Sequence, residues 1–149
     1  MTYYEQEMRR IFANTPFFRN AVFNDRTVLA DLDRERCVKL TLETGGISNC
    51  YDTIRLRVIN KNSGEIDNVK FEFWDIFEKI RTKNNPQGIT AHIWAYDGQI
   101  KWYGKEPTDA ECKRLADMVS DYVSIYHPHS TADLSVDIDT EELTDEEEI

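Results

Sequence analysis

Cysteines are scarce in this chain and follow none of the usual patterns. The three among its 149 residues are Cys37, Cys50 and Cys112, an odd number without a Cys-x-x-Cys pair. A secreted disulfide scaffold needs an even set of cysteines, and a structural zinc site needs closely spaced pairs of ligands. We therefore expect free, buried thiols, with neither a disulfide framework nor a zinc site.

The sequence also lacks the motifs of several large enzyme classes. It has no Gly-x-Ser-x-Gly elbow, His-Glu-x-x-His pair, Gly-x-x-x-x-Gly-Lys-Ser/Thr loop or Gly-x-Gly-x-x-Gly turn, which excludes those classes alone. The candidates for a metal site are His92, His127, His129 and two Asp-x-Asp pairs, Asp31 with Asp33 and Asp137 with Asp139. They are weak candidates, because the further ligands of zinc and calcium sites are missing. We expect a protein that is not an enzyme and uses no metal or cofactor.

Long apolar runs are missing as well. Crossing a bilayer takes roughly 20 apolar residues, and no run approaches that length. The opening residues, MTYYEQEMRR, are polar and include acids, unlike the start of a secretory signal, so we expect a cytoplasmic protein. Hydrophobic residues nevertheless make up 40% of the chain and aromatics 11%, which is enough to bury the core of one domain.

Charge is concentrated at one end of the sequence. Of 28 acids, nine lie in residues 133–149, which contain no Lys or Arg, and this leaves 19 acids against 18 bases in residues 1–132. The nine are Asp133, Asp137, Asp139, Glu141, Glu142, Asp145, Glu146, Glu147 and Glu148. We therefore divide the chain into a nearly neutral domain, residues 1–132, and an acidic tail, residues 133–149.

Hydrophobic periodicity predicts an α+β fold. Alternating residues predict three hairpins, which pair 27–32 with 36–44, 51–60 with 66–74, and 89–96 with 100–104 across the Asp97-Gly98 turn. Helical spacing predicts helices at 3–13, at 76–83 after an Asp75 cap, and from Thr108, which forms a capping box with Glu111. The stripe of this last helix is Cys112, Leu115, Ala116, Val119, Tyr122, Val123 and Tyr126. We expect a single antiparallel sheet of about six strands, with N-terminal, central and C-terminal helices on one face.

Three tryptophans lie on predicted strands. If Phe71 and Phe73 face the core, Trp74 leaves that face, and either Trp102 or Tyr103 leaves it as well. Aromatic residues outside a core are typical of a contact surface, although a covering helix is the more usual explanation.

Several segments together resemble a known domain family. They are TYYEQEMRRIFANTPFFRNAVF, YDTIRLRVINKNSGEIDNVKFEFWDIF, HIWAYDGQIKWYG and PTDAECKRLADMVSDYVSIY. The pattern resembles one of the small domains associated with large polyvalent proteins of phages, plasmids and conjugative elements of Firmicutes-type bacteria. The likeness covers residues 2–126 and brings no catalytic motif. It implies a mobile-element protein that accompanies or protects incoming DNA.

The tail has a pattern that suits mimicry of nucleic acid. In DLSVDID, Leu134, Val136 and Ile138 alternate with polar residues, and acids on one face of a strand would repeat every ~6.6 Å. Each strand of duplex DNA carries a phosphate per ~3.4 Å of axis, so the acids from Asp133 to Glu148 can occupy Lys and Arg rows that bind DNA. The alternatives are a disordered, solvating tail and a strand added to a sheet edge.

These observations favour a non-catalytic inhibitor from a phage or conjugative element. Such small acidic anti-CRISPR and DNA-mimic inhibitors have a similar size and charge, and the expected partner is a host CRISPR or restriction nuclease, not nucleic acid or a membrane. The alternative is an accessory or scaffolding module of conjugation with a solvating tail. A third interpretation is direct nucleic-acid binding by a basic strip on the outer sheet face: Arg34, Arg36, Lys39, Arg55 and Arg57.

Overall fold

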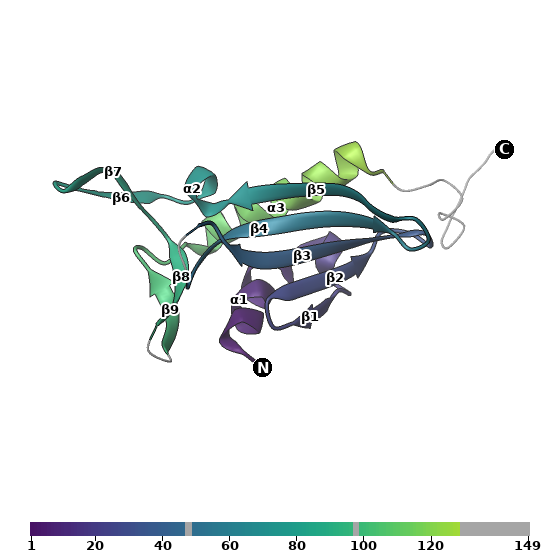
Figure 1. Cartoon of the computed structure of the whole chain (residues 1–149), viewed down its shortest axis with the longest axis horizontal. Coiled ribbons are helices and arrows are strands. Elements are labelled where there is room, and N and C mark those ends of the chain that lie inside the picture. Colours follow the sequence, from purple (N-terminus) through teal and green to yellow (C-terminus); the bar gives the residue numbers. More distant parts are fainter. Residues whose placement is uncertain (47–48, 97–98, 129–149) are drawn as a thin grey trace.

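The protein is described by a computed structural model that covers residues 1–46, 49–96 and 99–128 (Figure 1). Its helices are α1 (Tyr3–Phe12), α2 (Phe73–Ile76) and α3 (Asp109–Tyr126), with a 3-10 turn at Pro16–Phe18. Its strands are β1 (Val22–Asn24), β2 (Thr27–Asp31), β3 (Arg36–Thr44), β4 (Cys50–Asn60), β5 (Gly64–Glu72), β6 (Lys79–Thr82), β7 (Asn85–Thr90), β8 (His92–Tyr96) and β9 (Gln99–Tyr103).

Seven strands form one antiparallel sheet, which confirms an α+β fold built on one main sheet. The order is β1-β2-β3-β4-β8-β9, and β5 also pairs with β4. The long strand β4 pairs with β8 through Cys50 and Tyr51, and with β5 over the rest of its length. Strand β1 was not predicted from the sequence. Strands β6 and β7 pair only with each other among the described elements, and they project from the body in Figure 1.

The core lies between the sheet and the two longer helices. The first two predicted hairpins are confirmed as β2 with β3 and β4 with β5. Alternation along β3 and β4 buries Leu40 and Leu56, which lie opposite each other where the two hairpins pair. Helices α1 and α3 lie on the same face of the sheet in Figure 1, and they contribute Met8, Phe12 and Leu115 to one continuous apolar cluster. The opposite face of the sheet carries the polar residues of the same strands.

The predicted central helix at 76–83 is wrong. Helix α2 ends at Ile76, Asp75 lies inside it, and residues 79–82 form β6. A helix of eight residues gains few hydrogen bonds against a costly nucleus, so it is marginal without tertiary packing. Strand β6 instead pairs with β7, and Thr82 lies opposite Asn85 across a two-residue turn.

Helix α3 begins as the sequence predicts. The Thr108 hydroxyl accepts a hydrogen bond from the Glu111 backbone N–H at 3.1 Å, and the Glu111 carboxylate accepts one from the Thr108 N–H at 2.9 Å. The stripe from Cys112 to Val123 faces the core, with Tyr122 half-buried. Tyr126 was expected on this stripe but is 65% exposed, and its ring lies 4.7 Å from that of Tyr122 in the last turn of the helix.

Replacing Thr108 with alanine is expected to lower the free energy of unfolding by about 1 kcal/mol, because one N–H of the first turn loses its acceptor. Urea unfolding followed by circular dichroism measures the change. Ser124→Ala, at an exposed position of the same helix, is the control and should change the free energy by less than about 0.5 kcal/mol. Equal losses in the two variants would contradict a capping role.

Candidate interaction surfaces

The acidic tail that carries the predicted partner-binding residues lies outside the described residues. This applies to Asp133, Asp137, Asp139, Glu141, Glu142, Asp145, Glu146, Glu147 and Glu148, and also to His129 and the Asp97-Gly98 turn. The last residue that the structure describes, Pro128, lies five positions before the tail begins. There the Arg36 guanidinium donates a hydrogen bond to the Pro128 carbonyl at 2.7 Å, just beyond the end of α3.

A half-buried polar cluster fixes the end of α3 on the sheet. The Tyr122 hydroxyl donates to Asp67 Oδ2 at 2.6 Å, and His127 Nε2 lies 2.7 Å from the same oxygen, which can only accept. These hydrogen bonds, with Tyr122 first, hold the pKa of Asp67 below its ordinary value. The Asp67 carboxylate in turn raises the pKa of Tyr122 to about 12. We call Asp67, Tyr122 and His127 the Asp67 cluster.

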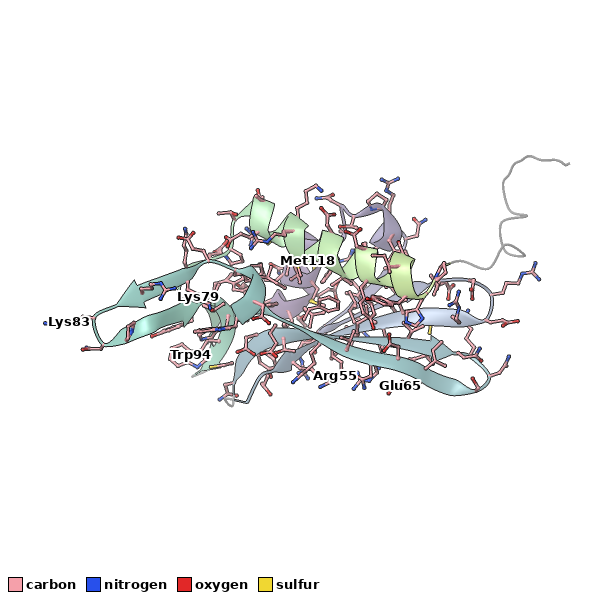
Figure 2. The ribbon with its side chains drawn as sticks, turned by 90° about the horizontal axis from the view of Figure 1, so that it is seen from above. Arg55, Glu65, Lys79, Lys83, Trp94 and Met118 are labelled. Carbon is pink, nitrogen blue, oxygen red and sulfur yellow. The ribbon has the colours of Figure 1, made fainter. Side chains whose placement is uncertain are left out.

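The basic strip predicted on the outer sheet face is interrupted by acids. Arg55 Nε lies 2.9 Å from Glu43, and Arg57 Nε lies 3.2 Å from Glu65. The face therefore alternates in sign, and Figure 2 shows Arg55 and Glu65 on neighbouring parts of it. Arg36 bonds both oxygens of Asp33 through its backbone and side chain. These ion pairs offset the charge of three of the five predicted cations, which weakens the case for a phosphate-binding strip here.

Of the hollows on the described surface, two that include a cationic side chain are considered as small-molecule sites. One, of about 390 Å³, lies between α1 and α3 and includes Arg10, Asp109 and Cys112. Arg10 already donates to the Pro107 carbonyl at 2.8 Å and to Asp109 at 3.2 Å. Burial raises the pKa of the Cys112 thiol to about 11, so this cysteine stays protonated at neutral pH and is a poor nucleophile. The other, of about 320 Å³, lies on the outer face around Leu29 and Lys39.

The metal candidates are engaged in other contacts. Asp31 pairs with Lys61 at 3.0 Å, Asp33 binds Arg36, and His92 Nδ1 lies 2.9 Å from the Thr90 carbonyl. Across the described ranges, three or more His, Cys, Asp or Glu side chains do not gather as metal ligands would. Of the thiols, Cys112 is buried as expected, while Cys37 and Cys50 are free but half-buried. None of the described helices is both long and apolar enough to cross a bilayer.

The projecting hairpin is basic, and sequence reasoning missed it. We call strands β6 and β7 with their turn, residues 79–90, the β6–β7 arm; its charged residues are Lys79, Arg81 and Lys83. Figure 2 shows Lys83 at the far tip and Lys79 nearer the body. Residues 79–105 contain five bases and one acid, a signal that was present in the sequence. The predicted helix over residues 76–83 does not indicate a basic ribbon, so this charge surplus did not identify a surface.

Aromatic side chains surround the root of this arm. Trp74 is 40% exposed and Tyr103 is 41% exposed, and Lys79 Nζ lies 3.8 Å from the centre of the Trp74 ring. Trp94 meets Tyr103 edge-on at 4.9 Å. We call Trp74, Trp94 and Tyr103 the aromatic platform. Trp102 turns inward instead, where its ring N–H donates to Glu7 at 2.8 Å, so Trp74 and Tyr103 are the residues that leave the core face.

Comparison with known proteins identifies no relative of this chain. No protein-family model, curated protein or solved structure matches it. The resemblance to domains associated with large polyvalent proteins therefore stays a prediction. The charge, exposure and geometry of its own residues are therefore the basis for proposing a function.

Proposed function

We propose that this protein is a non-catalytic inhibitor that blocks a host defence nuclease of the CRISPR or restriction type. The observation that carries the proposal is the separation of charge, because nine of 28 acids lie in the last 17 residues while the remaining residues are nearly neutral. Clustered carboxylates complement the Lys and Arg residues of a DNA-binding groove. Occupying that groove excludes the DNA target without any chemistry.

The folded domain has a well-held end close in sequence to these acids. The Asp67 cluster and the Arg36 contact to Pro128 hold the end of α3 against β5 and β3. The first of the nine acids, Asp133, follows five residues later in the sequence. In the proposal the folded domain is the support that presents the acids.

The proposal predicts that a purified CRISPR or restriction nuclease, out of a panel of both kinds, is inhibited by the full chain. The triple variant Asp133→Asn, Asp137→Asn, Asp139→Asn should need at least about tenfold more protein for half inhibition, because close charge pairs dominate such contacts. Inhibition by the full chain should also weaken as salt rises.

A matched control changes the same charge on the folded domain. Glu35→Gln, Glu72→Gln, Asp121→Asn neutralises three exposed acids and should leave half inhibition within about twofold, because scattered rim charges contribute little. Absence of inhibition across the panel would overturn the proposal. Equal losses from the tail and control variants would show that total charge, and not the tail, is responsible.

The outer sheet face favours a second candidate, an accessory interaction module of a conjugative element. Val22 is 64% exposed and Leu29 is 45% exposed on neighbouring strands, an apolar area beside Lys39. Exposed apolar side chains grouped on one face are typical of protein-binding surfaces. In this case Leu29→Asp would abolish capture of the partner, whereas the tail variant would leave capture intact.

A further inference from the structure

From the structure we infer that the β6–β7 arm and the aromatic platform bind single-stranded nucleic acid. Lys79, Arg81 and Lys83 contact the phosphate backbone, and the exposed rings of Trp74 and Tyr103 stack on bases. This site is separate from the acidic tail. It also differs from the basic strip predicted from the sequence, which acids of the outer face interrupt.

The first support is the distribution of charge within the folded domain. The arm, residues 79–90, holds three bases and no acid, whereas the rest of residues 1–132 holds 15 bases against 19 acids. The arm is therefore the basic part of an otherwise acidic protein. A local positive field on an acidic protein attracts phosphates to one place and repels them elsewhere, which favours a defined binding site over diffuse adhesion.

The second support is the position of the arm. It forms a separate two-stranded sheet that projects beyond the main sheet (Figure 1). Arg81 and Lys83 are exposed, and Figure 2 shows Lys83 at the tip. At about 3.3 Å per residue, Lys79 and Lys83 lie roughly 13 Å apart along the ribbon, a span that reaches more than one phosphate.

The Arg81 side chain makes one hydrogen bond within the arm and has further N–H donors. It lies at the irregularity in the pairing of β6 with β7, where one of its N–H groups donates to the Pro86 carbonyl at 2.6 Å. A guanidinium carries five N–H donors, so this hydrogen bond orients the side chain and leaves the others for a phosphate.

The third support is the aromatic platform, which favours a single strand over a duplex. In a duplex the base faces are stacked on each other, whereas a single strand offers them to exposed rings. Trp74 and Tyr103 are large, partly exposed aromatic residues at the root of a basic ribbon, and Lys79 already lies over the Trp74 ring. Basic grooves lined with aromatic side chains are the usual surface for single strands.

Binding is tested with the full chain and an oligothymidylate. All three tryptophans, Trp74, Trp94 and Trp102, lie at the arm side of the domain, so stacking should quench the intrinsic fluorescence. The triple variant Lys79→Gln, Arg81→Gln, Lys83→Gln should bind at least about tenfold more weakly, and its log-log salt slope should fall by about two. Trp74→Leu should weaken binding while leaving the salt slope unchanged.

The matched control is Arg19→Gln, Lys70→Gln, Arg114→Gln, which removes the same charge at exposed positions away from the arm. It should bind within about twofold of the parent chain. Equal weakening by both triple variants, a preference for duplex of the same length, or no quenching at low salt would each overturn the inference. Circular dichroism establishes that every variant is folded. No nuclease enters this assay, so its outcome is independent of the proposed inhibition.

Discussion

Replacing Phe73 with alanine will lower the free energy of unfolding by about 3–5 kcal/mol. Phe73 is fully buried in α2, and its ring lies 4.8 Å from that of Phe77 and 6.0 Å from that of Trp102. The residue joins the main sheet to the root of the β6–β7 arm, and rigid neighbours on both sides cannot collapse into the space it leaves. Urea unfolding, with the slope compared between variants, measures the loss.

The adjacent residue provides the control. Trp74→Ala removes an even larger ring, but that ring is 40% exposed and its described contact is the Lys79 ammonium group. The expected cost is about 1 kcal/mol, the size of a cation–π contact at a partly exposed site. If Phe73→Ala cost no more than Trp74→Ala, α2 would not be part of the core.

The elements that could be predicted from the sequence are those whose own residues carry the pattern. Val38, Leu40 and Leu42 alternate with polar residues over enough positions to determine both the strand and its buried face. The capping box of Thr108 and Glu111 likewise determines where α3 begins, and both residues lie within one turn. In each case the deciding interactions are local, so no knowledge of distant segments was needed.

The elements that could not be predicted depend on partners far away in the sequence. Residues 79–82 are too few to show a period, and they form a strand because β7 offers a partner. The pairing of β8 with the first residues of β4 joins segments about forty residues apart, which no local pattern encodes. The acids that interrupt the predicted basic strip also come from distant positions, because Glu43 pairs with Arg55 across the sheet.

The candidate site was predicted unevenly for the same physical reason. The alternation predicted for residues 66–74 placed Trp74 off the core face, although Trp74 lies in α2, two residues beyond the end of β5. That the ring is exposed, and not covered by a helix, could not be read from the sequence. The charge surplus of residues 79–105 was countable, but its meaning depended on recognising the segment as a projecting ribbon. Charge composition can be read directly from a sequence, whereas the surface on which the charges gather depends on the fold.

Acid is expected to release the end of α3 before the rest of the domain unfolds. Asp67 has a folded-state pKa below its unfolded value, chiefly through the Tyr122 hydrogen bond and then that of His127. A group of this kind contributes stability above its unfolded pKa of about 3.9 and loses it as the pH falls through the lower folded value. The hydrogen-exchange protection factors of residues 122–127, which are corrected for the intrinsic exchange rate at each pH, should therefore fall below about pH 4 while those of the core strands do not.

At high pH the same cluster loses its stabilising contribution through Tyr122, as the pH rises and not as it falls. The folded-state pKa of Tyr122 is raised to about 12, because its hydroxyl donates to the Asp67 carboxylate. Its contribution is complete below the unfolded value of about 10 and is lost as the pH rises through the folded value. Between these limits Asp67 stays ionised and Tyr122 stays protonated, so their hydrogen bond should persist. Its contribution to the free energy of unfolding can be measured by a series of urea unfolding curves across pH.

Removing the hydroxyl isolates the contribution of the cluster. Tyr122→Phe keeps the ring against Phe71 but leaves Asp67 with one partner fewer, at an expected cost of about 1–3 kcal/mol near neutral pH. Asp67→Asn should cost a similar amount, and the double variant should cost less than the two losses combined because the residues share one interaction. Asp117→Asn, which breaks an exposed pair with Lys113, is the control and should cost under about 0.5 kcal/mol. Additive losses from Tyr122→Phe and Asp67→Asn would mean that α3 is held to β5 by apolar packing alone.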